Sequence, residues 1–287
     1  MEYQGYHFYC HNRRLFGQYW YNENPKAAIV LVHGMGEHSG RYSGSLIPEL
    51  VDAGFAVFGY DLFGHGHSEG KRGCCPSFKA VLNSLEAVCM KKAEIFPELD
   101  LFLYGHSLGG NVVLNYAMNK KIHCKGLILS SPYLELAFDP PSWKLFLGKL
   151  CLYLYPKITL TSGIDPKFIS RVAEEVEKYK DDPLVHNKVS PLYTFPILES
   201  GQWIMQNPDK LTIKTLLFHG TGDYITSHWA SKAFAKQSPL IDLKLYKGGY
   251  HELHNDLQKE DLFKTVIDWL NEQLEAKQVN DLNTTQK

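Results

Sequence analysis

The sequence lacks the features that mark several classes of protein. It has no dense run of lysine and arginine, and its 30 basic and 31 acidic residues give a formal net charge of −1 at pH 7. Nucleic-acid-binding proteins gather positive charge on one face, so we expect no nucleic-acid partner. No stretch approaches the roughly 18 to 20 apolar residues that a membrane-spanning helix requires, so we expect no transmembrane segment.

The sequence also shows no secretory signal and no cysteine framework. Its first residues, MEYQGYHFYC, have neither the basic start nor the apolar run of a signal peptide. The cysteines show no paired spacing of the kind that binds metal or builds a disulfide scaffold. The six are Cys10, Cys74, Cys75, Cys89, Cys124 and Cys151. We therefore expect an intracellular, cytoplasmic protein with reduced thiols.

Short apolar runs alternate with longer segments of helical periodicity. The runs expected to form strands are 6–10, 15–20, 27–33, 55–60, 101–105, 125–131, 214–220 and 241–246. The first two flank a polar turn and predict an antiparallel hairpin, whereas the central runs are continuously apolar, as in strands buried on both faces. Helical patterns cover 78–96, 107–119, 228–236 and 259–274. This alternation predicts an α/β fold, a mostly parallel sheet with helices on both faces.

The stretch 133–208 interrupts the alternation. It contains a strongly apolar segment at 142–155 and a charged helical pattern at 171–180. We interpret it as a helical cap inserted over the carboxyl edge of the sheet. The predicted organisation is a core in two parts, the cap, and a frayed polar tail. These parts are 1–132 and 209–275 for the core, 133–208 for the cap, and 276–287 for the tail.

The motif Gly105-His106-Ser107-Leu108-Gly109 directly follows one of the apolar runs. By itself, G-x-S-x-G arises by chance in about one chain in ten of this length at ordinary residue frequencies. Between a strand and a helix, however, this motif forms a sharp turn that presents the serine hydroxyl at the top of the sheet. Ser107 is therefore the candidate nucleophile, and the alternative is that it is only a tight-turn residue.

A serine hydroxyl needs a neighbouring base before it can act as a nucleophile. In α/β-hydrolases the chain order is Ser, then Asp or Glu, then His. Asp223 follows the run 214–220, and His251 follows the run 241–246. Each alone could be an ordinary loop residue. In this order, after successive strands, they predict the catalytic triad Ser107, Asp223 and His251.

An oxyanion hole should combine the N–H of the residue after the nucleophile with an N–H from an early loop. The first is Leu108. The second is Met35, in the glycine-rich loop after the run 27–33, although this loop could also be a plain glycine turn. We expect no metal, because the run 64–68 lacks further ligands and 251–254 is not an H-E-x-x-H motif. No organic cofactor is required either.

Six segments together resemble a known family. They are HGMGEHSGRY (33–42), DLFGHGHSEGKRG (61–73), GHSLGG (105–110), SSPYL (130–134), HGTGDYIT (219–226) and YHELH (250–254). They are similar to the monoacylglycerol lipase and lysophospholipase group, in the serine aminopeptidase branch of the α/β-hydrolases. The resemblance covers about residues 25 to 275. It implies the same triad and the same oxyanion donors as those inferred above.

The resemblance also implies residues that bind the free glycerol hydroxyls. Matched motif by motif, these are Glu37, Arg41 and His254. A carboxylate acceptor, a forked donor and an imidazole could satisfy two vicinal hydroxyls. The alternative is that Glu37 and Arg41, four residues apart, simply pair with each other. One departure concerns Thr226, where human-type members carry a cysteine, so thiol-based control does not carry over to this chain.

The apolar part of the cap, 142–155, has too many apolar side chains for one solvated helix face. They could line an acyl-chain tunnel, dip into a lipid interface, or pack on the core. An interfacial role would make the protein peripheral to membranes or lipid droplets.

We therefore expect a serine ester hydrolase acting on single-chain acyl lipids, with a small lipid as partner and monoacylglycerol as the preferred substrate. The nearest alternative is a lysophospholipase, for which Lys144, Lys149 and Lys167 would supply cations. A carboxylesterase or peptidase of the same fold is a second alternative, and a non-catalytic binding protein is a third. The sequence does not indicate an oligomeric state.

Overall fold

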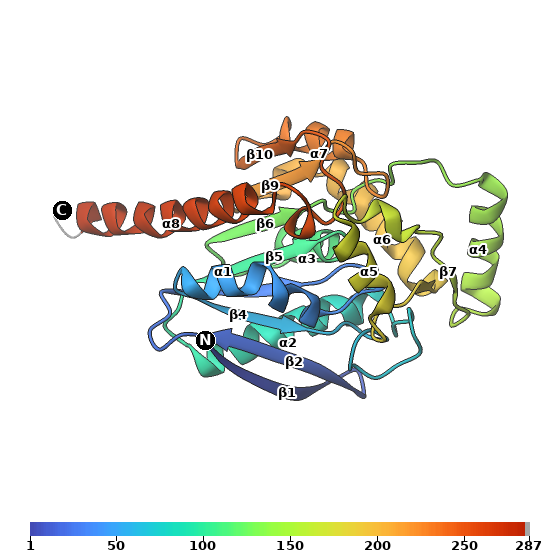
Figure 1. Cartoon of the computed structure of the whole chain (residues 1–287), viewed down its shortest axis with the longest axis horizontal. Helices are drawn as coiled ribbons and strands as arrows, with labels where there is room; N and C mark the ends of the chain where they lie inside the picture. Colours follow the sequence, from blue (N-terminus) through green and yellow to red (C-terminus); the bar gives the residue numbers. More distant parts are fainter. Residues whose placement is uncertain (285–287) are drawn as a thin grey trace.

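A sheet of eight strands forms the centre of the computed structural model, which describes residues 1–284 (Figure 1). Its strand order is β1-β2-β4-β3-β5-β6-β9-β10. The β1–β2 and β2–β4 pairs are antiparallel, and the other pairs are parallel. The strands are β1 (Glu2–Cys10), β2 (Arg13–Tyr21), β3 (Ala27–Val32), β4 (Phe55–Tyr60), β5 (Leu101–His106), β6 (Gly126–Ser130), β9 (Thr215–Gly220) and β10 (Ile241–Tyr246).

Two apolar layers lie on opposite faces of this sheet. Successive residues of β3 alternate between them, with Ile29 and Leu31 in one layer and Val30 and Val32 in the other. Helices α1 and α8 cover the first layer, while α2, α3 and α7 cover the second (Figure 1). Their bounds are α1 (Leu46–Asp52), α2 (Phe78–Ile95), α3 (Leu108–Asn119), α7 (His228–Ala235) and α8 (Lys259–Thr284). A strand buried on both faces has no polar side, which explains the continuous apolar runs.

The segment between β6 and β9 lies over the carboxyl ends of the strands. The carbonyl of Ile169, in this segment, accepts a hydrogen bond at 2.7 Å from the N–H of Glu252, which lies in the loop after β10. The N–H of His186, also in this segment, donates at 2.8 Å to the carbonyl of Gly36, which lies in the loop after β3. The elements of the segment between β6 and β9 are α4 (Ser142–Leu154), β7 (Leu160–Thr161), η2 (Pro166–Phe168), α5 (Ala173–Asp181), β8 (Lys188–Val189) and α6 (Pro191–Gln206). Three further 3₁₀ turns are η1 (Ser39–Gly44), η3 (Pro208–Lys210) and η4 (Leu253–Asn255).

The predicted α/β-hydrolase fold is confirmed, and each expected strand is present. Two helices were not predicted. Helix α1 is too short to show a clear period, and α6 contains Pro196, which reads as a helix breaker. The backbone of the predicted frayed tail continues α8 as far as Thr284, and its last three residues lie outside the described residues. Within the described residues, no helix combines the length and apolar composition needed to cross a bilayer.

Candidate active site

The loops that follow β3, β5 and β10 meet in one small cavity at the carboxyl edge of the sheet. Met35 and Glu37 come from the first loop, Ser107 from the second and His251 from the third, and all four line the cavity. Asp223 follows β9, and its carboxylate contacts the imidazole of His251. The structure thus brings together residues that are up to 216 positions apart in the chain, from Met35 to His251.

Ser107 occupies a strained turn between β5 and α3. Its backbone has φ 52° and ψ −114°, a region that residues with a side chain rarely adopt. The turn is possible because both flanking positions are glycine. A Cβ at Gly105 would lie 2.4 Å from the carbonyl oxygen of Gly109, and a Cβ at Gly109 would lie 2.0 Å from that of Val32. The two glycines of the motif are therefore a steric requirement of the fold.

His251 is held by Asp223. Nδ1 of His251 lies 2.7 Å from Oδ2 of the carboxylate, and both side chains are almost fully buried. Burial alone would lower the pKa of His251, but the charge and the hydrogen bond of Asp223 outweigh it, so the pKa is raised. Burial would raise the pKa of Asp223, but His251 and His219 hold it well below its ordinary value. Asp223 is thus an ionised carboxylate beside a basic imidazole.

Four further groups contact the Asp223 carboxylate and orient it. Oδ1 accepts hydrogen bonds from the N–H of Ile225 at 2.7 Å and of Thr226 at 3.1 Å. Oδ2 accepts one from the Thr226 hydroxyl at 2.9 Å and lies 3.0 Å from Nε2 of His219. Within the described residues, no hydrogen bond joins the Ser107 hydroxyl to Nε2 of His251, although both side chains line the same cavity.

The loop after β3 passes close to Ser107. A Cβ at Gly34 would lie 3.3 Å from Cβ of Ser107, so any larger residue here would force its neighbours to shift. Within the described residues, neither the N–H of Met35 nor that of Leu108 donates to a backbone carbonyl outside the helices and strands. Leu108 is also the first residue of α3, where backbone N–H groups lack partners within the helix. Both N–H groups are therefore free to bind a negatively charged oxygen.

Glu37 and Arg41 pair with each other, and a third residue joins them. Nη1 of Arg41 donates to Glu37 at 3.1 Å, and the guanidinium makes a bidentate pair with Glu252 at 2.6 and 2.9 Å. The three side chains are 2 to 6% exposed. Sequence reasoning missed Glu252, and the only hint was its position next to His251. The Tyr42 hydroxyl and the Gly34 N–H also donate to Glu37, at 2.8 and 2.6 Å.

His254 is buried beside this group, but it has no described polar partner. Its ring stacks on Tyr42 with the centroids 4.6 Å apart and meets the ring of His106 edge-on at 5.1 Å. Among the described residues, neither of its two nitrogens forms a hydrogen bond. Burial lowers its pKa to about 4, so the imidazole is neutral at pH 7.

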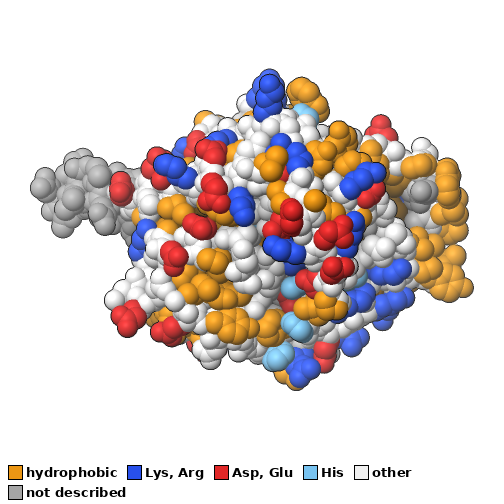
Figure 2. All heavy atoms as spheres, in the orientation of Figure 1, with side chains coloured by type: hydrophobic (Ala, Val, Ile, Leu, Met, Phe, Trp, Pro, Cys, Tyr) orange, Lys and Arg blue, Asp and Glu red, His pale blue; other side chains and the backbone are white. Residues whose placement is uncertain are grey.

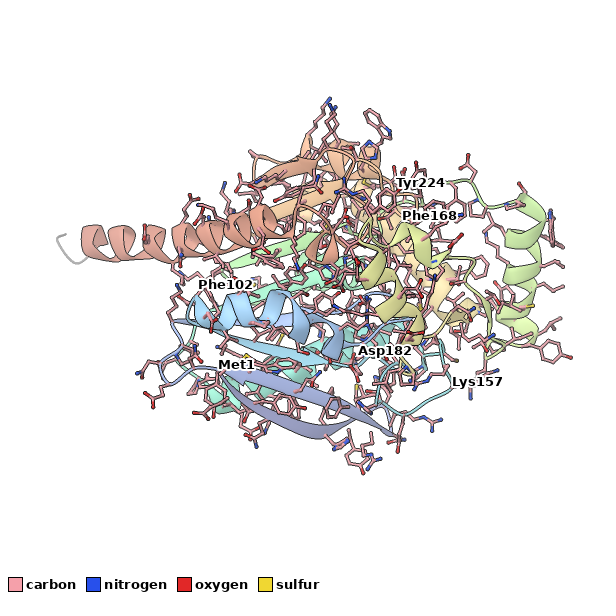
Figure 3. The ribbon with its side chains drawn as sticks, viewed as in Figure 1. Met1, Phe102, Lys157, Phe168, Asp182 and Tyr224 are labelled. Carbon is pink, nitrogen blue, oxygen red and sulfur yellow. The ribbon has the colours of Figure 1, made fainter. Side chains whose placement is uncertain are left out.

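The cavity beside Ser107 is almost closed by the segment that follows β6. Ile164, Ile169 and Tyr179 of that segment line it, and its volume is about 20 Å³. A space of this size holds about one water molecule, so it is too small for a lipid. Phe168 of the same segment packs against Tyr224, next to Asp223, with ring centroids 4.7 Å apart (Figure 3). In this structure the segment leaves no room for an acyl chain beside Ser107.

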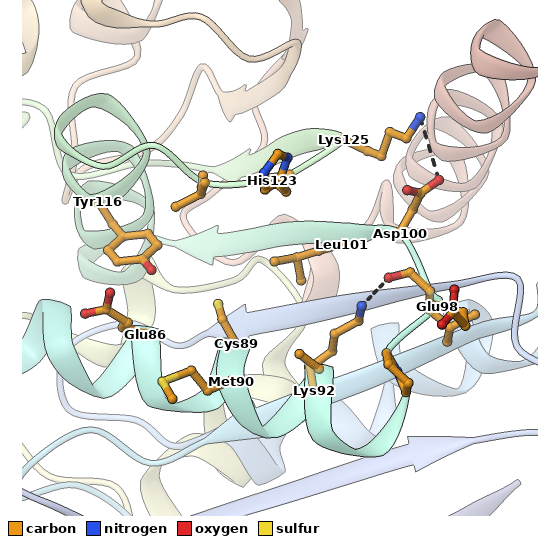
Figure 4. A pocket seen from close by; sticks show the side chains of 15 residues that line it. Glu86, Cys89, Met90, Lys92, Glu98, Asp100, Leu101, Tyr116, His123 and Lys125 are labelled. Carbon is orange, nitrogen blue, oxygen red and sulfur yellow. Dashed lines mark hydrogen bonds and ion pairs between the residues drawn. The ribbon is translucent and has the colours of Figure 1, made fainter. Parts of the chain in front are cut away.

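A larger crevice of about 740 Å³ lies elsewhere, between α2, α3 and the start of β5 (Figure 4). Leu101, the first residue of β5, lines it, whereas Ser107 follows the last residue of that strand. The crevice is therefore at the opposite end of the strand from the candidate site. Its charged side chains are partly paired already, as Lys125 with Asp100 and Lys120 with Glu86.

Most apolar side chains of α4 are exposed, whereas Leu145 and Leu152 are partly buried. Phe146 is 68% exposed, Tyr153 is 83% exposed and Leu154 is 61% exposed. Figure 2 shows apolar side chains gathered along the edge of the molecule where α4 lies, at the right of the view. Core packing, the simplest explanation of the apolar sequence at 142–155, therefore does not account for these residues.

Comparison with known proteins places the chain in a family. Residues 23–258 match the family described as serine aminopeptidase, S33. The monoglyceride lipase of Rattus norvegicus is 34% identical over 85% of this chain and 81% of its own length. The crystal structure of the monoacylglycerol lipase of Paleococcus ferrophilus superposes with a TM-score of 0.83 and 32% identity, covering 90% of this chain and 99% of that one.

An uncharacterised abhydrolase domain-containing protein of Dictyostelium discoideum is 35% identical, and this chain spans only 27% of its length. The rat lipase and the Paleococcus ferrophilus structure are instead matched over most of their own lengths. The chain belongs to the serine aminopeptidase (S33) family of α/β-hydrolases and is a serine ester hydrolase similar to monoglyceride lipases.

Proposed function

We propose that the protein hydrolyses monoacylglycerol to a fatty acid and glycerol, with Ser107, His251 and Asp223 as its catalytic triad. The observation that carries this proposal is the 2.7 Å contact between His251 Nδ1 and Asp223, at a cavity shared with Ser107. With its Nδ1 proton donated to Asp223, His251 keeps Nε2 unprotonated as a base.

Nε2 of His251 removes the hydroxyl proton as Ser107 Oγ attacks the ester carbonyl carbon. The carbonyl oxygen becomes negative, and the N–H groups of Met35 and Leu108 stabilise it. His251 then returns its proton to the glycerol oxygen, so that glycerol leaves and an acyl group remains on Ser107. Water, deprotonated by His251, attacks this acyl-enzyme and releases the fatty acid and the free serine.

The proposed glycerol site lies beside Glu37 and His254. Glu37 lines the cavity next to Ser107, and the neutral His254 is buried against the ring of His106, which also lines it, with both ring nitrogens lacking a described partner. Arg41 keeps Glu37 in place through their pair at 3.1 Å. An acceptor and an imidazole at one site suit the two free hydroxyls of a monoacylglycerol.

We also propose that α4 contacts a lipid surface. Its exposed aromatic and aliphatic side chains belong to the same chain segment as the residues that close the cavity. Apolar side chains that enter the interface region of a bilayer gain free energy in proportion to the area that they bury. Contact with lipid could thus supply the energy that moves the closing segment away from Ser107.

Fatty-acid release from a long-chain monoacylglycerol and from the lysophosphatidylcholine with the same acyl chain tests the proposal, with Ser107→Ala as the control. We expect faster release from the monoacylglycerol and no release by the variant. A preference for the phospholipid would keep the triad but overturn the substrate. Release by neither would overturn the proposed function.

A further inference from the structure

The cavity beside Ser107 is lined by carboxylates and not by fixed cations. Among the described residues that line it are Glu37 and Glu252, but no lysine or arginine. The nearest guanidinium belongs to Arg41, whose charge is taken up by these same two carboxylates. Any headgroup that reaches Ser107 therefore meets acceptors of hydrogen bonds and no free positive charge.

Glu252 makes more and shorter hydrogen bonds with Arg41 than Glu37 does. It binds both terminal nitrogens of the guanidinium, whereas Glu37 contacts one. Its second oxygen also accepts a hydrogen bond from the Asn255 amide at 2.9 Å. Burial would raise the pKa of Glu252, but Arg41 holds that pKa well below its ordinary value, so Glu252 is ionised. By contrast, burial raises the pKa of Glu37.

We propose that Glu252 is a specificity-determining residue, which neutralises Arg41 and so admits an uncharged polyol headgroup while excluding a phosphate-bearing one. The proposal rests on the proposed monoacylglycerol hydrolysis and assigns its headgroup selectivity to one carboxylate. In a buried site with few water molecules, a phosphate beside an ionised carboxylate is strongly disfavoured. Without Glu252, Arg41 would retain an unpaired donor, and guanidinium groups bind phosphate well.

The test compares 1-oleoylglycerol with 1-oleoyl-lysophosphatidate, in the same detergent micelles, by their kcat/KM values. Glu252→Gln keeps the side-chain shape and removes its charge. We expect the ratio of lysophosphatidate to monoacylglycerol turnover to rise at least about tenfold in this variant, because the site then carries one negative charge fewer. An unchanged ratio in a folded Glu252→Gln protein would overturn the proposal.

Asp256→Asn is the matched control. Asp256 is also fully buried and also pairs with an arginine, Arg171, at 2.9 Å, but it does not line the cavity. We expect its substrate ratio to stay at the wild-type value. A rise equal to that of Glu252→Gln would mean that loss of any buried ion pair loosens the site, and would overturn a specific role for Glu252.

The double variant Arg41→Gln with Glu252→Gln separates charge from structure. Because it removes both charges, we expect its ratio of lysophosphatidate to monoacylglycerol turnover to return toward the wild-type value. If the effect of Glu252→Gln came from damage to the fold, the second substitution would increase that damage and would not restore the ratio. The acid limb of the Glu252→Gln pH profile should also move to lower pH, since Glu252 helps to raise the pKa of His251. A ratio that stays high in the double variant would overturn the role of Arg41.

If Glu252→Gln does not fold, the wild-type protein still provides a test by competition. The ether analogue 1-O-oleylglycerol should inhibit monoacylglycerol hydrolysis much more strongly than its phosphate ester does. Equal inhibition would overturn the proposal. The proposed function fails in a different way, because the wild type would then cleave neither lipid or would prefer the phosphate-bearing one.

Discussion

Nε2 of His219 lies 3.0 Å from Oδ2 of Asp223, the same carboxylate oxygen that Nδ1 of His251 approaches to 2.7 Å. The other ring nitrogen of His219 lies 2.8 Å from the Ser231 hydroxyl, inside the core. Asp223 is therefore held from two sides, by one histidine that faces the cavity and one that faces the core. A carboxylate oriented in this way does not have to rearrange when His251 becomes charged.

Replacement of the carboxylate tests the triad directly. In Asp223→Asn, the amide cannot hold the Nδ1 proton of His251, so that Nε2 is no longer the free base. We expect kcat to fall by about 10⁴, as in other enzymes with this arrangement, while the fold is retained. Stopped-assay kinetics and circular dichroism measure the two effects. Turnover near the wild-type rate would mean that Asp223 has no catalytic role.

The second histidine should matter less than the first. A hydrogen bond to a charged group contributes about 1.5 to 3 kcal/mol. We therefore expect His219→Phe to lower the free energy of unfolding by about 2 kcal/mol and kcat by about tenfold. Urea titration and steady-state kinetics check this, with His228→Gln as the control. If kcat is unaffected, the backbone N–H groups and the Thr226 hydroxyl are enough to orient Asp223.

The pH dependence of hydrolysis should report the basicity of His251. Burial lowers the pKa of His251, but Asp223 raises it by more, to above the ordinary 6.5. The base acts only when unprotonated, so activity should be lost as pH falls through this raised pKa. We expect the acid limb of kcat/KM to have a midpoint above 6.5. A midpoint clearly below 6 would contradict the assignment of His251 as the base.

Two buried histidines should make stability fall in mild acid. Burial lowers the pKa of both His33 and His254 to about 4. Between pH 6.5 and 4, the unfolded chain therefore binds protons that the folded protein does not, and the free energy of unfolding decreases as pH falls. Each contributes up to about 3 kcal/mol at pH 4. Urea titrations from pH 7 to 5 should show this slope, and it should be smaller in His254→Phe.

The exposed face of α4 should control binding to lipid vesicles. Phe146→Glu together with Tyr153→Glu places charge where the wild type exposes apolar side chains, so we expect at least about a fivefold loss of vesicle binding in a sedimentation assay. Turnover of a short, water-soluble ester should be unchanged. Tyr9→Glu, also at a 78% exposed aromatic residue but on β1, is the control. Equal binding by the wild type and the double variant would contradict the proposed membrane contact.

Much of the fold could be predicted because its signals are local. A continuous apolar run such as 27–33 predicts a strand buried on both faces, and the structure places β3 there. Helix α6 could not be predicted in this way. Its internal Pro196 reads as a breaker, and burial of Tyr193 and Ile197 against the rest of the chain overrides that local preference.

The candidate site divides in the same way. Ser107, Asp223 and His251 were predicted because each follows its own strand in the chain order of the fold. Glu252 and His219 were not predicted, because their positions in the sequence match no motif that would indicate a role in the site. Only their burial beside Arg41 and Asp223 makes them part of the site.

The sequence by itself determined the α/β architecture, the serine turn and the candidate triad, since these depend on short-range patterns and on the order of strands. Only the tertiary structure decided which charges meet. In the structure, Glu37 and Arg41 form a buried group with Glu252, and His254 has no described partner. The side chains of Phe146, Tyr153 and Leu154 on α4 are exposed. Electrostatic energy depends on distance and burial, and neither quantity is contained in the spacing of residues along a chain.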